Sequence, residues 1–202
     1  GQSKQQRENS MSYNRETVTG PAKVFFTADT HFGHARMLEF EKRPFVDVDE
    51  HDSLITDWFC EDMPPGSTLY HLGDMAWTPE AADRFLTAME RRRVRVVWIR
   101  GNHDHRCLTP SSGGLRNAPL DSLWLDIAWH PFRGLWLSHY PHLSWPNSFH
   151  GSAHLFGHVH GKCGSLPPFG RMLDVGLMNW NFRPLPLATV LELMDGREAS
   201  PV

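Results

Sequence analysis

Short apolar segments alternate with segments of helical periodicity over the first half of the chain. Residues 24–28, 68–72 and 94–99 are apolar and rich in β-branched or aromatic side chains, which is typical of buried strands. Residues 49–60 place their apolar side chains on one face and predict a helix, and residues 79–91, which begin with a proline, predict another. This alternation of strand and helix predicts a mostly parallel sheet with helices on its faces.

The second half of the chain is richer in short apolar segments and poorer in helical periodicity. Residues 109–119 have the composition of a loop. We expect a second sheet here, packed against the first with helices outside, so that residues 21–202 form one domain. The strands expected in this half are residues 123–127, 135–138, 153–156, 171–175 and 187–193.

Residues 1–20 lack any such pattern. They are rich in Gln, Ser, Asn and Arg, so we expect a disordered N-terminal tail, partly a remnant of a tag, with Met11 as the native start. The chain shows no apolar run of about 18 residues. It shows no apolar leader either, so we expect neither a membrane partner nor a signal peptide.

Composition and charge narrow the classes of partner. Hydrophobic residues make up 40% of the 202 positions and charged residues 21%, an ordinary globular balance. A formal charge of -3 argues against a nucleic-acid or anionic-membrane surface, and we assign the basic run at residues 91–93 to a solvated helix end. Cys60, Cys107 and Cys163 are not spaced as a zinc knuckle or redox pair, so we expect free thiols and a cytoplasmic protein. The pattern leaves the oligomeric state open.

Polar side chains that ligate metals recur directly after the predicted strands. Because strand ends in one sheet system can converge on a common rim, we expect these side chains to meet. A single Asp-x-His or His-x-His pair often occurs by chance, but repeated clusters at strand exits do not. The set is Asp29, His31, Asp74, Asn102, His103, His139, His158 and His160, drawn partly from the 13 histidines of the chain.

The chemistry of these donors suggests a pair of metal ions. Oxygen and nitrogen donors without thiolates suit Mn, Fe or Zn, and even seven of these eight donors are too many for one tetrahedral zinc. Two ions about 3.5–4 Å apart clamp both oxygens of an in-line displacement and lower the pKa of a bridging water. Anionic phosphate esters need this chemistry most, so the pattern predicts metal-dependent phosphoester hydrolysis.

The same residues form five ordered motifs. These are Asp29-x-His31, Gly73-Asp74, Gly101-Asn102-His103-Asp104, His139 and Gly157-His158-x-His160. They resemble the motifs of the calcineurin-like metallophosphoesterases, and the surrounding segments at residues 27–34, 43–45, 70–74, 138–141 and 181–184 resemble its small single-domain bacterial and phage branch. One departure is Met75-Ala76-Trp77, where many relatives place a charged or aromatic residue after the Gly-Asp pair.

The resemblance implies a fold and a set of cofactors. The fold is α/β, a four-layer α/β/β/α sandwich in which two packed mixed β-sheets are flanked by helices. The cofactors are two transition-metal ions, with Mn first and Fe or Zn as alternatives. The ligands implied are Asp29, His31 and His160 for the first ion, Asn102, His139 and His158 for the second, and Asp74 between them.

The resemblance also assigns roles to three residues that are not ligands. His103 donates a proton to the leaving-group oxygen, and its acidic neighbour Asp104 orients the ring. Arg100 stands where a guanidinium could grip the phosphate, and a plain surface salt bridge is an equal alternative. We expect a phosphodiesterase or phosphatase that acts on small phosphate esters or nucleotides by in-line attack of a metal-bridging hydroxide.

Two alternatives from other classes stay open. A non-catalytic protein-interaction module on the same fold is disfavoured because no expected ligand is missing. A metal-dependent nuclease is disfavoured because the chain lacks a basic stripe.

Several further residues are weaker candidates. His34 could contact the substrate or be packed, and we interpret His71 as a core or supporting residue. Residues 141–154 have the composition of a loop over the site, where ordinary loop roles outweigh substrate binding. The remaining candidates are His142, Asn147, His150, His154, Trp145, Trp180, Phe169, Asp174 and Asn179.

Overall fold

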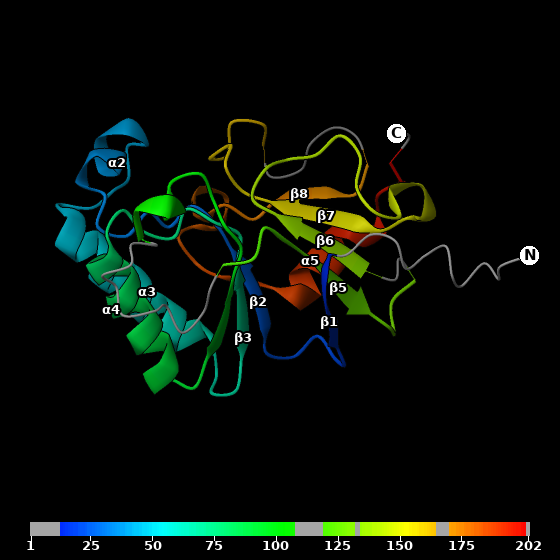
Figure 1. Cartoon of the computed structure of the whole chain (residues 1–202), viewed down its shortest axis with the longest axis horizontal. Coiled ribbons are helices and arrows are strands. Elements are labelled where there is room, and N and C mark those ends of the chain that lie inside the picture. Colours follow the sequence, from blue (N-terminus) through cyan, green and yellow to red (C-terminus); the bar gives the residue numbers. More distant parts are fainter. Residues whose placement is uncertain (1–12, 108–118, 132–133, 165–169, 201–202) are drawn as a thin grey trace, which may run out of the picture.

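Two mixed β-sheets lie against each other and helices flank them (Figure 1). The computed structural model describes residues 13–107, 119–131, 134–164 and 170–200 of the chain. One sheet has four strands in the order β4-β3-β2-β9, and the other has five in the order β1-β5-β6-β7-β8. The expected α/β sandwich is confirmed.

The four-stranded sheet contains the three strands expected in the first half of the chain. β2 pairs in parallel with β3, and β3 with β4, whereas β9 pairs with β2 in the antiparallel direction. Parallel pairing brings the C-terminal ends of the first three strands to one edge of the sheet. The strands are β2 (Val24–Thr27), β3 (Thr68–His71), β4 (Arg95–Trp98) and β9 (Leu185–Pro186).

Two helices, α3 (Val48–Asp62) and α4 (Pro79–Arg91), cover one face of this sheet (Figure 1). Each begins at a capping side chain, because Asp47 accepts a hydrogen bond from the N–H of Glu50 at 2.9 Å and Thr78 accepts one from that of Ala81 at 3.2 Å. The helix predicted at residues 79–91 is confirmed, and α3 extends the other predicted helix at both ends. A short helix, α2 (Ala35–Phe40), was not predicted. The side chains buried between helices and sheet include Phe25, Ile55, Phe59, Leu69, Phe85, Met89, Val96 and Trp98.

The five-stranded sheet mixes both directions of pairing. β1 pairs in parallel with β5, β5 and β6 are antiparallel, and β6, β7 and β8 are parallel. The ends of β6 and β7 therefore point the same way, as do those of β2 to β4 in the other sheet. The strands are β1 (Asn14–Val18), β5 (Ser122–Ile127), β6 (Gly134–Ser138), β7 (Ala153–Phe156) and β8 (Met172–Asp174).

The main core lies between the sheets. Alternate strand residues point into it, such as Phe26 and Tyr70 from one sheet and Leu137 and Leu155 from the other. The helix α5 (Leu187–Asp195) packs on the same core. On its other face the five-stranded sheet carries a second cluster, made of Trp124, Trp136, Phe156 and Met172 with Trp145 from the loop after β6.

Two expectations about local structure are wrong. Residues 187–193 form most of α5 rather than a strand, because Leu187, Val190, Leu191 and Met194 are buried at helical spacing and pack together on the core. The end of the expected tail is a strand, because β1 pairs with β5 along its whole length.

Some expectations fall outside the described residues. These are residues 1–12 of the expected tail, with Met11, and residues 109–118 of the expected loop. Within the described ranges, the helices are all too short or too polar to cross a membrane.

Candidate metal centre

Five loops that each follow a strand meet at one edge of the sandwich. The loops follow β2, β3 and β4 of one sheet and β6 and β7 of the other, and Figure 1 shows these strand ends facing the same region. The expected donors come together there, although they are far apart in the sequence. They are Asp29, His31, Asp74, Asn102, His139, His158 and His160.

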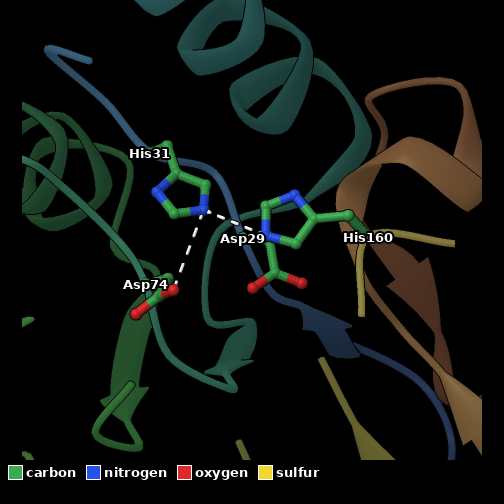
Figure 2. Close-up of side chains that lie close together, drawn as sticks. All are labelled: Asp29, His31, Asp74 and His160. Carbon is green, nitrogen blue, oxygen red and sulfur yellow. Dashed lines mark hydrogen bonds and ion pairs between the residues drawn. The ribbon is translucent and has the colours of Figure 1, made fainter. Parts of the chain in front are cut away.

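The first group of donors contains Asp29, His31, Asp74 and His160 (Figure 2). One ligand atom of each lies within 4.8 Å of the others. The Nε2 atom of His31 is 3.4 Å from Nε2 of His160 and 3.8 Å from Oδ2 of Asp74. Figure 2 shows both carboxylates and both rings directed into one space.

The second group contains Asp74, His139 and His158. The Nε2 atom of His139 lies 3.5 Å from Oδ2 of Asp74. The side-chain oxygen of Asn102 joins this group, because it is 3.0 Å from Nε2 of His139 and 3.0 Å from Nδ1 of His158. Asp74 thus belongs to both groups, and its carboxylate lies between them.

The backbone is strained at most of these positions. Five of the seven donors have positive φ: Asp29 at 59°, His31 at 52°, Asp74 at 53°, His158 at 71° and His160 at 49°. For a residue that has a Cβ atom, this left-handed conformation is less stable than the right-handed one by roughly 1–2 kcal/mol. Such strain concentrates at functional sites, where the surrounding structure enforces it.

Close approach of the loops also requires glycine. A Cβ atom added to Gly73 would lie 2.5 Å from Nδ1 of His139. The N–H of Asp29 donates to the carbonyl of Gly73 at 3.0 Å, so the same glycine ties two of the loops together. Its position just before Asp74 explains why a Gly-Asp pair stands at this strand exit.

Burial shifts the pKa values of the titratable side chains in the first group. Burial and the carboxylates of Asp74 and Asp174 raise the pKa of Asp29 well above its usual range. Burial also raises the pKa of Asp74. Burial, followed by the charges of Arg43 and His160, lowers the pKa of His31 well below its usual range. Bound cations would stabilise both the charged carboxylates and the neutral imidazole.

A hydrogen bond from outside the groups orients the ring of His139, and a carboxylate lies near the ring of His160. The Nδ1–H group of His139 donates to the carbonyl of Leu72 at 2.8 Å, so the Nε2 lone pair faces Asp74. The Nδ1 atom of His160 lies 3.6 Å from Oε1 of Glu41. Burial lowers the pKa of both rings to about 4, which keeps them in the neutral form that metals bind.

The donor set fits metal ions. All seven donor side chains offer oxygen or imidazole nitrogen, and the shared carboxylate of Asp74 connects two groups that could each hold an ion. The cysteines do not contribute: Cys107 donates its S–H to the carbonyl of Ala76, and Cys163 is exposed.

His103 lies beside the first group but its ring is partly open to solvent. Its backbone N–H donates to Oδ1 of Asp74 at 2.8 Å, and its Nε2 atom is 4.0 Å from Oδ2 of the same carboxylate. The side chain is 35% exposed, so a molecule at the centre could reach the ring.

Asp104 has a different role from the one expected. Its carboxylate does not orient the ring of His103 in the described structure. Instead it accepts hydrogen bonds from the backbone N–H groups of Asp74, Met75 and Gly101 and from the indole of Trp98. The reason is geometric, because Asp104 is buried beneath the two loops and its carboxylate points at their N–H groups.

The structure gives Arg100 the salt bridge that was the alternative to phosphate binding. Its Nε atom lies 3.7 Å from Oδ1 of Asp121, and both side chains are half or more exposed. In the described ranges its side chain has no hydrogen bond or ion pair with the donors of the centre. A phosphate contact for Arg100 therefore stays a prediction.

Arg43, in the segment at residues 43–45, supports the centre from below. It is 4% exposed, and its guanidinium donates to the carbonyl oxygens of Asp29 and Thr30 at 2.8 Å each. It also lies 2.8 Å from Nε2 of His51. A guanidinium so placed holds the strained loop that carries Asp29 and His31. An arginine next to proline in a short polar segment gives no signal of this role.

The sequence suggests no role for Asp174, and the structure supplies one. It accepts hydrogen bonds from the N–H groups of Gly161 at 3.0 Å and Gly176 at 2.7 Å. The first of these bonds fixes the residue next to His160. Asn179 adds a side-chain hydrogen bond to the same carboxylate.

Two histidines that follow or lie within the strands are packed. His71 is buried and its Nε2 atom is 2.8 Å from the hydroxyl of Thr30, which supports the loop after β2. His34 is 7% exposed, and its ring lies against Trp77 with 3.8 Å between ring centroids.

Some side chains of residues 141–154 pack on the outer face of the five-stranded sheet, and cover of the donors by this segment stays a prediction. His154 is buried, with Nδ1 donating to the carbonyl of Trp136 and Nε2 accepting from the N–H of His142. Trp145 is buried in the same cluster. Asn147 forms a left-handed turn and His150 ends a single 3-10 turn. Trp180 donates its indole N–H to the carbonyl of Asp174, and Phe169 lies outside the described residues.

Comparisons with known proteins support the fold. No protein-family model matches the chain. An uncharacterized protein of Methanocaldococcus jannaschii is 25% identical over 178 residues, which cover 86% of this chain and 92% of that protein. The crystal structure of a protein of unknown function from Aquifex aeolicus matches with a TM-score of 0.60 at 18% identity, over 84% of this chain and 98% of that one. Nuclease MPE of Pseudomonas putida matches with a TM-score of 0.41 at 22% identity, over 69% of this chain and 63% of that one. The chain thus shares its fold with a solved protein, and its own donors form a cluster that could hold metal ions.

Proposed function

We propose that the protein is a two-metal phosphoester hydrolase that acts on small phosphate esters or nucleotides. One observation carries the proposal: the carboxylate of Asp74 belongs to two adjacent groups of metal-binding side chains. A shared carboxylate between two sets of ligands is the arrangement that places two cations within reach of one phosphate.

Each group would hold one ion. Asp29, His31 and His160 would hold the first and Asn102, His139 and His158 the second, with Asp74 contributing to both. A bound pair of cations would neutralise charge on the phosphoryl oxygens and lower the pKa of a nearby water. Because the donors combine imidazoles with carboxylate and amide oxygens, Mn, Fe or Zn fit better than Ca.

His103 is the residue best placed to move a proton. It lies next to the first group, its ring is 35% exposed, and its backbone is tied to Asp74 at 2.8 Å. A ring held there would protonate the oxygen of the departing group. Asp104 would contribute by fixing the backbone on both sides of the centre rather than by contacting the ring.

A completely formed donor set favours an enzyme over a non-catalytic module of the same fold. The two predict different metal contents, because a module has no need of the ions. About two ions per purified chain supports the enzyme, and none supports the module.

The proposal can be tested with bis(p-nitrophenyl) phosphate. The protein is stripped with a chelator, reloaded with Mn, Fe or Zn, and followed by release of nitrophenol. We expect activity that disappears on chelation and returns with metal. In the Asp74→Asn variant both metal binding and turnover should be lost, whereas Asp83→Asn, at an exposed position on α4, should behave as wild type. No hydrolysis with any of these metals would refute the proposal.

A further inference from the structure

The side of the centre that carries His103 continues into a wall of packed side chains. The rings of Trp77 and His34 are 3.8 Å apart between centroids, and the guanidinium carbon of Arg106 is 4.0 Å from the centroid of Trp77. The centroids of Trp77 and His103 are 5.4 Å apart, and those of His34 and His31 are 5.9 Å apart. Arg106 and His103 therefore lie against the same indole ring, that of Trp77.

The position of Arg106 is fixed by the structure beneath it. It lies in the single-turn helix η2 (Asp104–Cys107), whose first and last residues are buried. Its N–H donates to the carbonyl of His103 at 3.2 Å. The contact with Trp77 orients the guanidinium as a cation over an aromatic face and leaves the N–H groups at its edge for other acceptors.

The guanidinium of Arg106 can also be reached from solvent. The residue is exposed, and in the part of the chain that the structure describes no carboxylate lies within ion-pair distance of it. Two other arginines at the surface differ in this respect, because the exposed Arg95 pairs with Glu16 and the partly buried Arg183 pairs with Glu61. A fixed guanidinium without a carboxylate partner suits an anion from outside the chain.

Positive charge gathers at this wall. Burial lowers the pKa of His34, and the charges of His103, Arg43, Arg106 and Arg36 lower it further, in that order. The guanidinium groups of Arg36, Arg43 and Arg106 thus lie close enough to act on one buried ring, although the whole chain carries a formal charge of -3. Cationic side chains next to a reactive centre attract anionic ligands.

We infer that Arg106, positioned by Trp77, forms a subsite for a second phosphate group. The preferred substrate would then carry a phosphate on its leaving group in addition to the phosphoester that is cut. A guanidinium binds two phosphate oxygens through parallel hydrogen bonds, and a nucleotide or short oligonucleotide with a terminal phosphate supplies such a group. The inference rests on the function proposed above and narrows its substrate class.

The test compares three substrates that share one scissile bond type. They are dithymidine phosphate without a terminal phosphate, with a 5′-phosphate and with a 3′-phosphate. The readout is a ratio of two kcat/KM values. The numerator is the higher of the values for the two phosphorylated substrates, and the denominator is the value for the unphosphorylated substrate. We expect roughly a tenfold or larger ratio for the wild type with Mn, as expected for one charge-assisted contact. A general loss of activity leaves this ratio unchanged.

Two variants and a control locate the effect. Arg106→Gln should bring the ratio close to one, and Trp77→Leu should lower it, because the guanidinium loses its support without losing charge. Arg92→Gln, an exposed arginine at the end of α4, should keep the wild-type ratio. A wild-type ratio near one, or an unchanged ratio in Arg106→Gln, would overturn the inference. An unchanged ratio in Trp77→Leu would remove Trp77 from the subsite.

A binding measurement separates this inference from the proposed function. Thymidine 3′,5′-bisphosphate and thymidine 5′-monophosphate are titrated into the metal-loaded protein by calorimetry. The bisphosphate should bind roughly tenfold more tightly, and Arg106→Gln should abolish the difference. Failure to hydrolyse bis(p-nitrophenyl) phosphate would refute only the proposed function. Equal affinity for the two nucleotides would refute only the subsite.

Discussion

Replacing Asp104 by asparagine should destabilise the whole centre, because this carboxylate joins two of the loops that carry donors. Its Oδ2 atom accepts from the N–H of Asp74 at 2.9 Å, from the indole of Trp98 at 3.0 Å and from the N–H of Gly101 at 2.7 Å. Its Oδ1 atom accepts from the N–H of Met75 at 2.9 Å. Asparagine has one carbonyl oxygen and one NH₂ group, so at least one of these four donors would face another donor.

The size of the effect follows from these contacts. Bonds to a charged acceptor are worth about 1 kcal/mol more than bonds to a neutral one, and a buried N–H left without an acceptor loses about 1–3 kcal/mol. Part of this loss is offset, because burial already raises the pKa of Asp104 and a neutral amide is easier to bury. We expect the free energy of unfolding of Asp104→Asn to fall by about 3 kcal/mol.

The measurement is urea unfolding of the metal-free protein followed by tryptophan fluorescence. Asp121→Asn is the matched control, because that carboxylate is 88% exposed and, among the described residues, is paired with Arg100 alone. Its unfolding free energy should stay within about 0.5 kcal/mol of the wild type. If Asp104→Asn changes stability by less than about 1 kcal/mol but alters the dependence of rate on the leaving group, Asp104 acts on the ring of His103 and our reasoning is wrong.

Three further predictions concern single histidines and their partners. Glu41→Gln should weaken metal binding by roughly tenfold through the ring of His160, measured by competition with a chelating dye, whereas Glu39→Gln in the adjoining helix α2 should not. Equal dissociation constants for Glu41→Gln and the wild type would exclude Glu41. Burial lowers the pKa of His154 to about 3 from 6.5, so its contribution to stability is complete above pH 6.5 and is lost as the pH falls toward 3. Between about pH 7 and pH 5 the wild type should lose about 2 kcal/mol more unfolding free energy than His154→Gln, and parallel pH curves would assign the loss elsewhere. In His103→Ala turnover should fall most for esters with poor leaving groups, and an equal loss for all esters would remove His103 from proton donation.

Much of the fold was predictable from the chain because its signals are local. Most strands of both sheets are short apolar runs, and α4 begins with an N-cap threonine followed by proline. Prediction from local patterns was wrong for two segments whose structure depends on contacts with residues far away in the sequence. The run at residues 187–193 is apolar enough for either element, and only its packing on the core beside β2 and β9 selects a helix. The polar strand β1 becomes ordered through pairing with β5 and through the contact of Glu16 with Arg95.

The candidate centre was likewise predictable in part. The sequence predicts which residues are donors, because each follows a strand and parallel strands bring the residues that follow them to one edge. The sequence does not predict how the donors are arranged. Contacts between distant loops decide the position of Asp74 in both groups, the left-handed backbone at five donors and the four hydrogen bonds to Asp104. Residue types and spacing can report which atoms are available to a metal, but distances between loops of different sheets arise only when the two sheets pack.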